Sequence, residues 1–175
     1  MKYYTHIFSI LFLVALFTAC GNRQHAVISS TIDSFYTRST AGDYRLANKS
    51  LLTPELAGLI EAATSKQAAA AAALKAAGST DKPHMIEGDI FTSLLEGSTE
   101  HKVLSIKVNG TAAEAVVQFE HSQYNYKWSD RVQLQQIDGA WKIDDVIYTS
   151  GKGAGKSTRD VLTQFLRLPD ELPAP

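Results

Sequence analysis

Apolar residues in the first third of the chain recur every three or four positions, which is the period of an amphipathic helix. The segment VISSTIDSFYTRST places the following side chains on one face: Val27, Ile28, Ile32, Phe35 and Tyr36. The pattern predicts a helix that is broken at Gly42-Asp43, followed by a helical turn within Asp43–Leu52.

A second helix is predicted from Thr53-Pro54-Glu55-Leu56, where Thr is the N-cap, Pro takes the first helical position and an acid follows. It extends to Ala77, with Gly78 as its C-terminal stop. Its second half contains six consecutive alanines, Ala68 to Ala73, which favour a helix but bury little area. We therefore expect a thinly packed or exposed extension, or else a surface that a partner helix approaches closely.

The connector Ser79–Glu100 follows, with one proline, two glycines and several apolar residues. A connection of this length inside a small domain is often functional. Its apolar residues predict that it packs against the domain: Met85, Ile86, Ile90, Phe91, Leu94 and Leu95.

Beyond the connector, apolar and polar residues alternate with the period of a β-strand. Two tight turns are indicated at Asn109-Gly110 and Asp138-Gly139, and Ser122–Ser129 reads as a polar bend rich in aromatic residues. The predicted strands are Val103–Val108, in which Leu104, Ile106 and Val108 alternate with Ser105 and Lys107, then Ala113–Glu120, Arg131–Ile137 and Ala140–Tyr148.

A last helix is predicted over Ser157–Leu168, and Pro169, Pro173 and Pro175 mark a tail over 169–175. Helices followed by an antiparallel meander and a final helix indicate an α+β fold. We expect a single domain over 27–168, with amphipathic helices covering one face of the sheet.

The N-terminus predicts export. Met1-Lys2 precedes an apolar run of 11 residues from Ile7 to Phe17, which is too short to span a bilayer and is typical of a signal peptide. The segment ending at Cys20 resembles a bacterial lipobox, with Phe17 in place of the usual leucine. The prediction is a signal peptide over 1–19, then a lipidated Cys20 and a polar tether over 20–26.

Cys20 is the only cysteine, so no intramolecular disulfide is possible. An acylated Cys20 would hold the protein on a lipid bilayer facing the periplasm. Gly21 follows in place of the aspartate that signals inner-membrane retention in enteric bacteria, so that resemblance favours the outer membrane.

Composition and motifs exclude several classes of function. After loss of Lys2, the 17 basic residues become 16, against 18 acidic ones, and this balance argues against nucleic acid as a partner. The stretch SGKGAGKST is similar to the phosphate-binding loop GxxxxGK[ST], but Ser150 stands in place of its first glycine. The preceding strand is also predicted to be antiparallel, whereas nucleotide-binding loops of this type follow a strand of a parallel sheet. We therefore expect no nucleotide. Scattered histidines give no metal-ligand spacing, and no catalytic motif or cofactor is expected.

Two acids are candidate site residues. Asp145 shares a strand face with Trp141 and Ile143, so it is expected to be partly buried. It is then either a general base in an apolar setting or a carboxylate bonded to a loop or helix end. Asp89, beside Glu87 in the connector, is either a turn and capping residue or part of a site.

Tyr124, Tyr126 and Trp128 form an aromatic cluster in the predicted bend. Exposed Tyr and Trp side chains are typical anchors of protein interfaces. The alternative is ordinary packing against the sheet.

Four short motifs carry a resemblance that extends over roughly Ile32 to Leu168. They are Ser34-Phe35-Tyr36, Leu52-Thr53-Pro54-Glu55-Leu56, Gly88-Asp89-Ile90-Phe91-Thr92-Ser93 and Asp138-Gly139-Ala140-Trp141-Lys142-Ile143-Asp144-Asp145-Val146. They resemble a bacterial family of unknown function that includes the YbjP-type envelope lipoproteins. The family's usual Asp-Pro-Phe stands here as Asp89-Ile90-Phe91, and the alanine run is a further departure. The resemblance implies a cone-shaped α+β fold, similar to cystatins and nuclear transport factor 2, and brings no catalytic residue.

Two functional hypotheses follow. The first is a non-enzymatic lipoprotein that binds an envelope protein, as an accessory subunit or as an immunity-like protein. Its contact surfaces would be the connector Glu87–Leu95, with Asp89 and Phe91, and the bend Tyr124–Trp128. The second is a small-ligand pocket between helices and sheet, with weak hydrolase or isomerase chemistry that uses Asp145 or Asp89.

Overall fold

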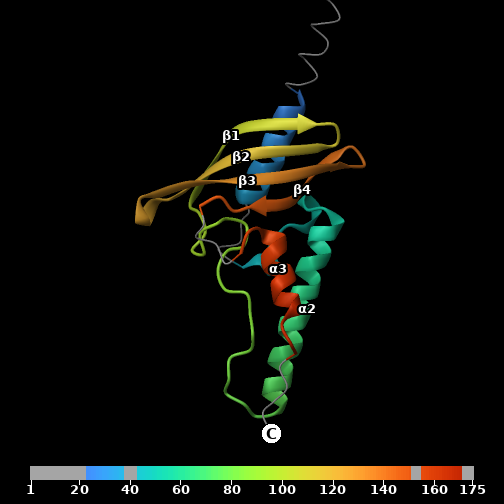
Figure 1. Ribbon diagram of the computed structural model, residues 1–175, viewed down its shortest axis with the longest axis vertical. Helices are drawn as coiled ribbons and strands as arrows, with labels where there is room; N and C mark the ends of the chain where they lie inside the picture. The colour runs from blue at the N-terminus through green and yellow to red at the C-terminus, as the bar shows by residue number, and fades with distance from the viewer. Residues whose placement is uncertain (1–22, 38–42, 151–154, 171–175) are drawn as a thin grey trace, which may run out of the picture.

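The computed structural model describes residues 23–37, 43–150 and 155–170, so the predicted signal peptide and Cys20 lie outside the described residues. Within those residues the chain forms three α-helices and four strands (Figure 1). These are an N-terminal helix over 23–37, α2 (Pro54–Ala76), β1 (Glu100–Asn109), β2 (Ala112–His121), β3 (Tyr126–Ile137), β4 (Ala140–Ile147) and α3 (Thr158–Arg167).

The sheet is an antiparallel meander in the order β1-β2-β3-β4, which confirms the predicted α+β fold. Asp138 and Gly139 turn the chain between β3 and β4 with φ of 51° and 77°, the left-handed values that this tight turn requires. The β1–β2 turn lies one residue later than predicted, because Asn109 still pairs with Ala112 and Gly110 takes the positive φ of 61°.

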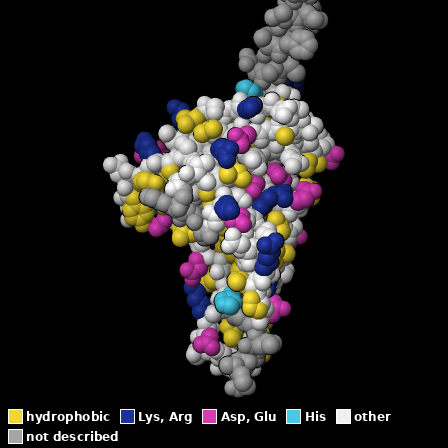
Figure 2. Space-filling model, viewed as in Figure 1, with side chains coloured by type: hydrophobic (Ala, Val, Ile, Leu, Met, Phe, Trp, Pro, Cys, Tyr) yellow, Lys and Arg dark blue, Asp and Glu magenta, His cyan; other side chains and the backbone are white. Residues whose placement is uncertain are grey.

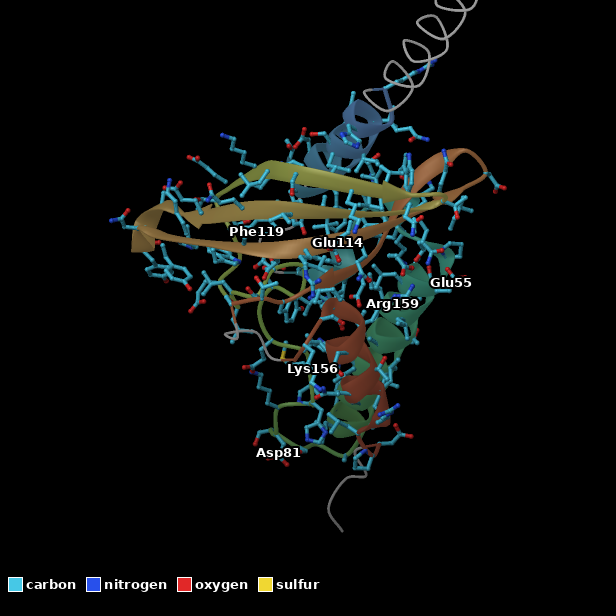
Figure 3. All side chains as sticks on the ribbon, turned by 45° about the horizontal axis from the view of Figure 1, so that its top comes forward. Glu55, Asp81, Glu114, Phe119, Lys156 and Arg159 are labelled. Atoms are coloured by element: carbon cyan, nitrogen blue, oxygen red, sulfur yellow. The ribbon has the colours of Figure 1, made fainter. Side chains whose placement is uncertain are left out.

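The N-terminal helix covers one face of the sheet, and α2 and α3 extend side by side beyond β4 as a stem (Figure 1). The edge of β4 is shielded, since Leu52 bridges Ile143 and Ser157 bridges Ile147. Alternate residues of β2 face the helix and are buried, among them Phe119, whose ring packs edge-on against Tyr36 at 4.9 Å. The opposite face of the sheet carries polar side chains such as Glu114 (Figure 3).

The helix boundaries follow the predicted signals. Thr53 caps α2 by accepting from the Leu56 amide at 3.3 Å, and Gly78 follows its end with φ of 66°. Ser157 caps α3 in the same manner, accepting from the Asp160 amide at 3.2 Å. Most of the alanine run is exposed, which confirms the thinly packed second half of α2.

Two sequence predictions about the sheet are wrong. β3 begins at Tyr126 and not at Arg131, because the bend is confined to the short turn that Asn125 closes with φ of 47°. Leu104 does not share a face with Ile106 and Val108, which pack against the core. A register shift between Val103 and Ser105 turns its side chain outward, where it is 49% exposed.

Candidate functional site

The connector between α2 and β1 has no regular structure, yet its middle is fixed to the sheet by one buried carboxylate. Asp130 on β3 is 0% exposed. It accepts hydrogen bonds from the Ser93 amide at 2.8 Å, the Thr149 amide at 2.9 Å and the Trp128 indole at 3.1 Å. Three donors satisfy a buried charge and join the connector, β3 and the end of β4.

Sequence reasoning missed Asp130 because the predicted bend included Ser129 and the strand was started at Arg131. With β3 begun at Tyr126, strict alternation puts Trp128, Asp130 and Val132 on the inner face. A buried acid two residues from a tryptophan is the signal that would have located it.

Hydroxyl groups from three elements hold the next part of the connector. Tyr36 on the N-terminal helix donates to the Phe91 carbonyl at 2.9 Å, and Thr158 on α3 donates to the Ile90 carbonyl at 2.5 Å. Tyr148 donates to the same Ile90 carbonyl. Burial, with Asp89 and Asp130 nearby, raises the pKa of Tyr36 well above its ordinary value, so its hydroxyl keeps the proton that it donates.

Asp89 organises the connector's own turn and is 7% exposed. Its Oδ1 accepts from the Phe91 amide at 2.6 Å, while its amide donates to the Leu95 carbonyl at 2.8 Å. Burial raises the pKa of Asp89 to about 6. Gly88 has φ of 75° and a Cβ there would lie 2.6 Å from the Leu95 carbonyl oxygen, so the turn requires glycine. This geometry matches the turn interpretation of Asp89.

Asp145 lies on β4 and is buried, and its carboxylate faces the start of α3. Its Oδ1 accepts from the Arg159 amide at 3.0 Å and from the Val146 amide at 2.9 Å, and burial raises its pKa. This is the bonding expected of a carboxylate at a helix end. Neighbouring Asp144 pairs with the Arg159 guanidinium and accepts from the Thr53 hydroxyl at 2.9 Å, so α2, β4 and α3 meet there (Figure 3).

The aromatic cluster is divided between interior and surface. Trp128 is buried and stacks on Tyr126 at 5.5 Å, whereas Tyr124 is 56% exposed and stacks on His121 at 4.3 Å. Phe91 is also buried, against Phe35 at 4.9 Å. Of the predicted contact residues, Tyr124 is therefore the one whose ring lies largely in solvent.

A surface cleft opens where the connector faces α3. We call it the stem cleft. Its volume is about 430 Å³, and its lining is mainly apolar: Met85, Ile86, Glu87, Leu95, Val161, Gln164, Phe165 and Leu168. The sequence indicated the connector residues but not the contribution of α3.

A second hollow, the alanine groove, lies beside the stem cleft and shares Phe165 with it. It has a volume of about 500 Å³ and is lined by Ser65, Lys66, Ala69, Ala70, Ala73, His84, Phe165, Pro169 and Asp170. Asp89 and Asp145 line neither hollow.

Charges around the two hollows are paired. Lys82 forms an ion pair with Glu87 at the stem cleft. Lys66 binds the Leu168 carbonyl at 2.5 Å and Asp170 at 3.0 Å, which closes the end of α3 onto α2. The chemistry offered to a ligand is therefore chiefly apolar contact.

The described residues contain no group of three His, Cys, Asp or Glu side chains placed to hold a metal ion. No helix among them is long and apolar enough to cross a membrane. Part of the SGKGAGKST stretch, residues 151–154, lies outside the described residues, and its Ser157 serves as the α3 cap.

Comparison of the chain with protein-family models, with curated proteins and with solved structures finds no match. The resemblance to YbjP-type lipoproteins stays a prediction.

Proposed function

We propose that the protein is a lipid-anchored lipoprotein of the bacterial envelope that binds a partner protein through the stem cleft and has no catalytic role. One observation carries the proposal. Seven large hydrophobic residues are exposed among the described residues, and three of them line this one cleft: Met85, Leu95 and Leu168, which are 37%, 42% and 42% exposed. Clustered exposed apolar side chains mark interaction sites, whereas scattered ones do not.

The segments that form the walls of the stem cleft are held by hydrogen bonds in the absence of a partner. Asp130 and the Tyr36 hydroxyl hold the connector, and Lys66 holds the carbonyl of Leu168. A partner would therefore bind without first ordering these segments, which saves conformational entropy. The buried acids are used in this scaffold, and each accepts hydrogen bonds from the backbone.

The partner is an envelope protein that presents an apolar segment. The charged side chains next to the cleft, Lys82 and Glu87, neutralise each other, so the cleft favours neutral, apolar side chains. A cleft of this size would form the centre of an interface whose rim includes the rest of the stem.

We expect that a photo-crosslinking amino acid placed at Leu95 in the full-length protein captures one dominant envelope protein in living cells. The matched control is Leu46, which is 67% exposed and lies outside the stem cleft. Adding Leu168→Asp should reduce capture from position 95 roughly tenfold, as expected for a central apolar contact. Equal capture from positions 95 and 46, or none from 95, would contradict the proposal.

The alanine groove favours a second candidate function, the binding of a small apolar ligand. Its volume of about 500 Å³ is within the range of ligand pockets, and alanine methyl groups leave that space open. In this version of the ligand hypothesis Asp89 and Asp145 have no role, because they do not line the groove.

Ala70→Leu is expected to abolish binding of the apolar dye N-phenyl-1-naphthylamine, because the larger side chain fills the groove. Ala71→Leu is the matched control, since Ala71 is exposed on the same helix and does not line the groove. Dye fluorescence is titrated for both variants after thermal melts show that both are folded. Equal dye binding by both variants, or none by the unsubstituted protein, would remove this candidate.

A further inference from the structure

The end of the molecule opposite the stem is formed by two elements. The N-terminal helix crosses the inner face of the sheet, and its first turns project past β1, away from α2 and α3 (Figure 1). β1 is an edge strand of the sheet. We call this end the β1 face. It includes Arg23 and Val27 on the first turns of the helix and Leu104 on β1, together with Lys102 and Lys107, which project from β1 on the side of the sheet opposite to the helix.

The β1 face lies close to the predicted anchor in the sequence. The described part of the helix begins at Arg23, three residues after Cys20. Three residues span at most about 11 Å even when fully extended. If Cys20 is acylated, as the proposed function assumes, the start of the helix is held within that distance of the bilayer.

The β1 face is partly apolar. Val27 is 46% exposed and Leu104 is 49% exposed. The exposure of Leu104 arises from the register shift, which lets Val103 and Ile106 pair with buried positions of β2 and turns Leu104 outward. Packing within the sheet does not account for this apolar side chain at its edge.

The β1 face also carries cations without partners. Arg23, Lys102 and Lys107 form no ion pair with any described residue. On the neighbouring strands, by contrast, Lys127 pairs with Glu120 and Arg131 with Glu114. Figure 2 shows Lys and Arg side chains beside hydrophobic ones toward this end, with an acidic side chain among them. Apolar side chains among free cations suit the surface of an anionic membrane.

We propose that the β1 face rests on the anionic phospholipid surface to which Cys20 is anchored. The short link brings the face to the bilayer, Leu104 and Val27 contact the interfacial layer, and Lys102 and Lys107 lie near lipid phosphates. The stem, with its cleft, then points away from the membrane toward soluble or peripheral partners. This inference depends on the lipid anchor of the proposed function.

The test uses full-length protein purified from bacterial membranes and reconstituted in vesicles of phosphatidylethanolamine and phosphatidylglycerol. Cys20 is the only native cysteine, so Leu104→Cys supplies one free thiol when Cys20 is acylated. A fluorophore at that thiol should lose most of its emission when headgroup-nitroxide lipids are included. The matched control, Ala72→Cys on the exposed side of α2, should lose none.

Lys102→Gln combined with Lys107→Gln should restore much of the emission at position 104. The proposed contact would be overturned by equal quenching at positions 104 and 72, or by no quenching at position 104. It would also be overturned if the two lysine substitutions left the quenching at position 104 unchanged. Failure of the anchor itself gives a different result: mass spectrometry of the unsubstituted protein shows no acyl mass, and Cys20 reacts with the thiol reagent.

Discussion

Replacing Asp130 by alanine is expected to lower the free energy of unfolding by about 3–5 kcal/mol, because two buried donors and one partly buried donor lose their common acceptor. The Ser93 amide, the Thr149 amide and the Trp128 indole all point at this carboxylate. The bonds from Ser93 and Trp128 are buried, so these two donors would be left without a partner when the side chain is truncated. The change is measured by urea denaturation at neutral pH.

The control for Asp130 is Glu114→Ala on the open face of the same sheet. Glu114 pairs with Arg131 at 3.4 Å, the two side chains are 37% and 46% exposed, and pairs in contact with solvent contribute about 0–1 kcal/mol. Asp130 holds the connector against the sheet. The backbone amide hydrogens of the connector should therefore exchange faster with solvent in the Asp130 variant. A loss no larger than that of Glu114→Ala would show that the connector is held by other contacts.

Ionisation of Asp89 is expected to destabilise the folded protein by about 3 kcal/mol above pH 6, the cost that corresponds to a two-unit rise in pKa. Its pKa is raised from 3.8 to about 6 by burial. Between these values the folded chain keeps a proton that the unfolded chain has lost, so this contribution to stability falls as pH rises from 4 to 6. Asp89→Asn removes the ionisation and keeps an acceptor oxygen for the Phe91 amide.

The measurement is the difference in unfolding free energy between Asp89→Asn and the unsubstituted protein at pH 4.5 and pH 7.5. The variant should gain relative stability as the pH rises, and any constant effect of the substitution cancels. Glu87→Gln is a control of opposite sign, because Lys82 lowers the pKa of Glu87 and the pair is lost as the pH falls. A difference for Asp89→Asn that is the same at both pH values would contradict the assignment.

The helices and the order of the strands could be predicted because their signals are local. Thr53 and Ser157 are caps whose partners lie three residues away, and Asp138-Gly139 is a turn by its own backbone preference. The start of β3 was mispredicted because Tyr126 and Ser129 look like polar bend residues. Their strand conformation is fixed by pairing with β2, which propensity does not record.

The candidate site was only half predictable for the same reason. Apolar residues of the connector indicated that it packs down, and its turn required Gly88. The wall contributed by α3 and the anchoring carboxylate of Asp130 are separated from the connector by tens of residues, and Asp130 lies 37 positions after Ser93. Only the tertiary fold brings them together.

The pairing of early segments with late ones sets an order of folding. The Thr53 amide bonds to the Ile143 carbonyl at 2.8 Å, and Lys66 binds Asp170, 104 positions later. The three hairpins of the sheet are local, whereas α2 has no surface to bind until β4 and α3 exist. If the chain is exported as predicted and emerges N-terminus first from a translocation pore, α2 therefore stays undocked until α3 has also passed.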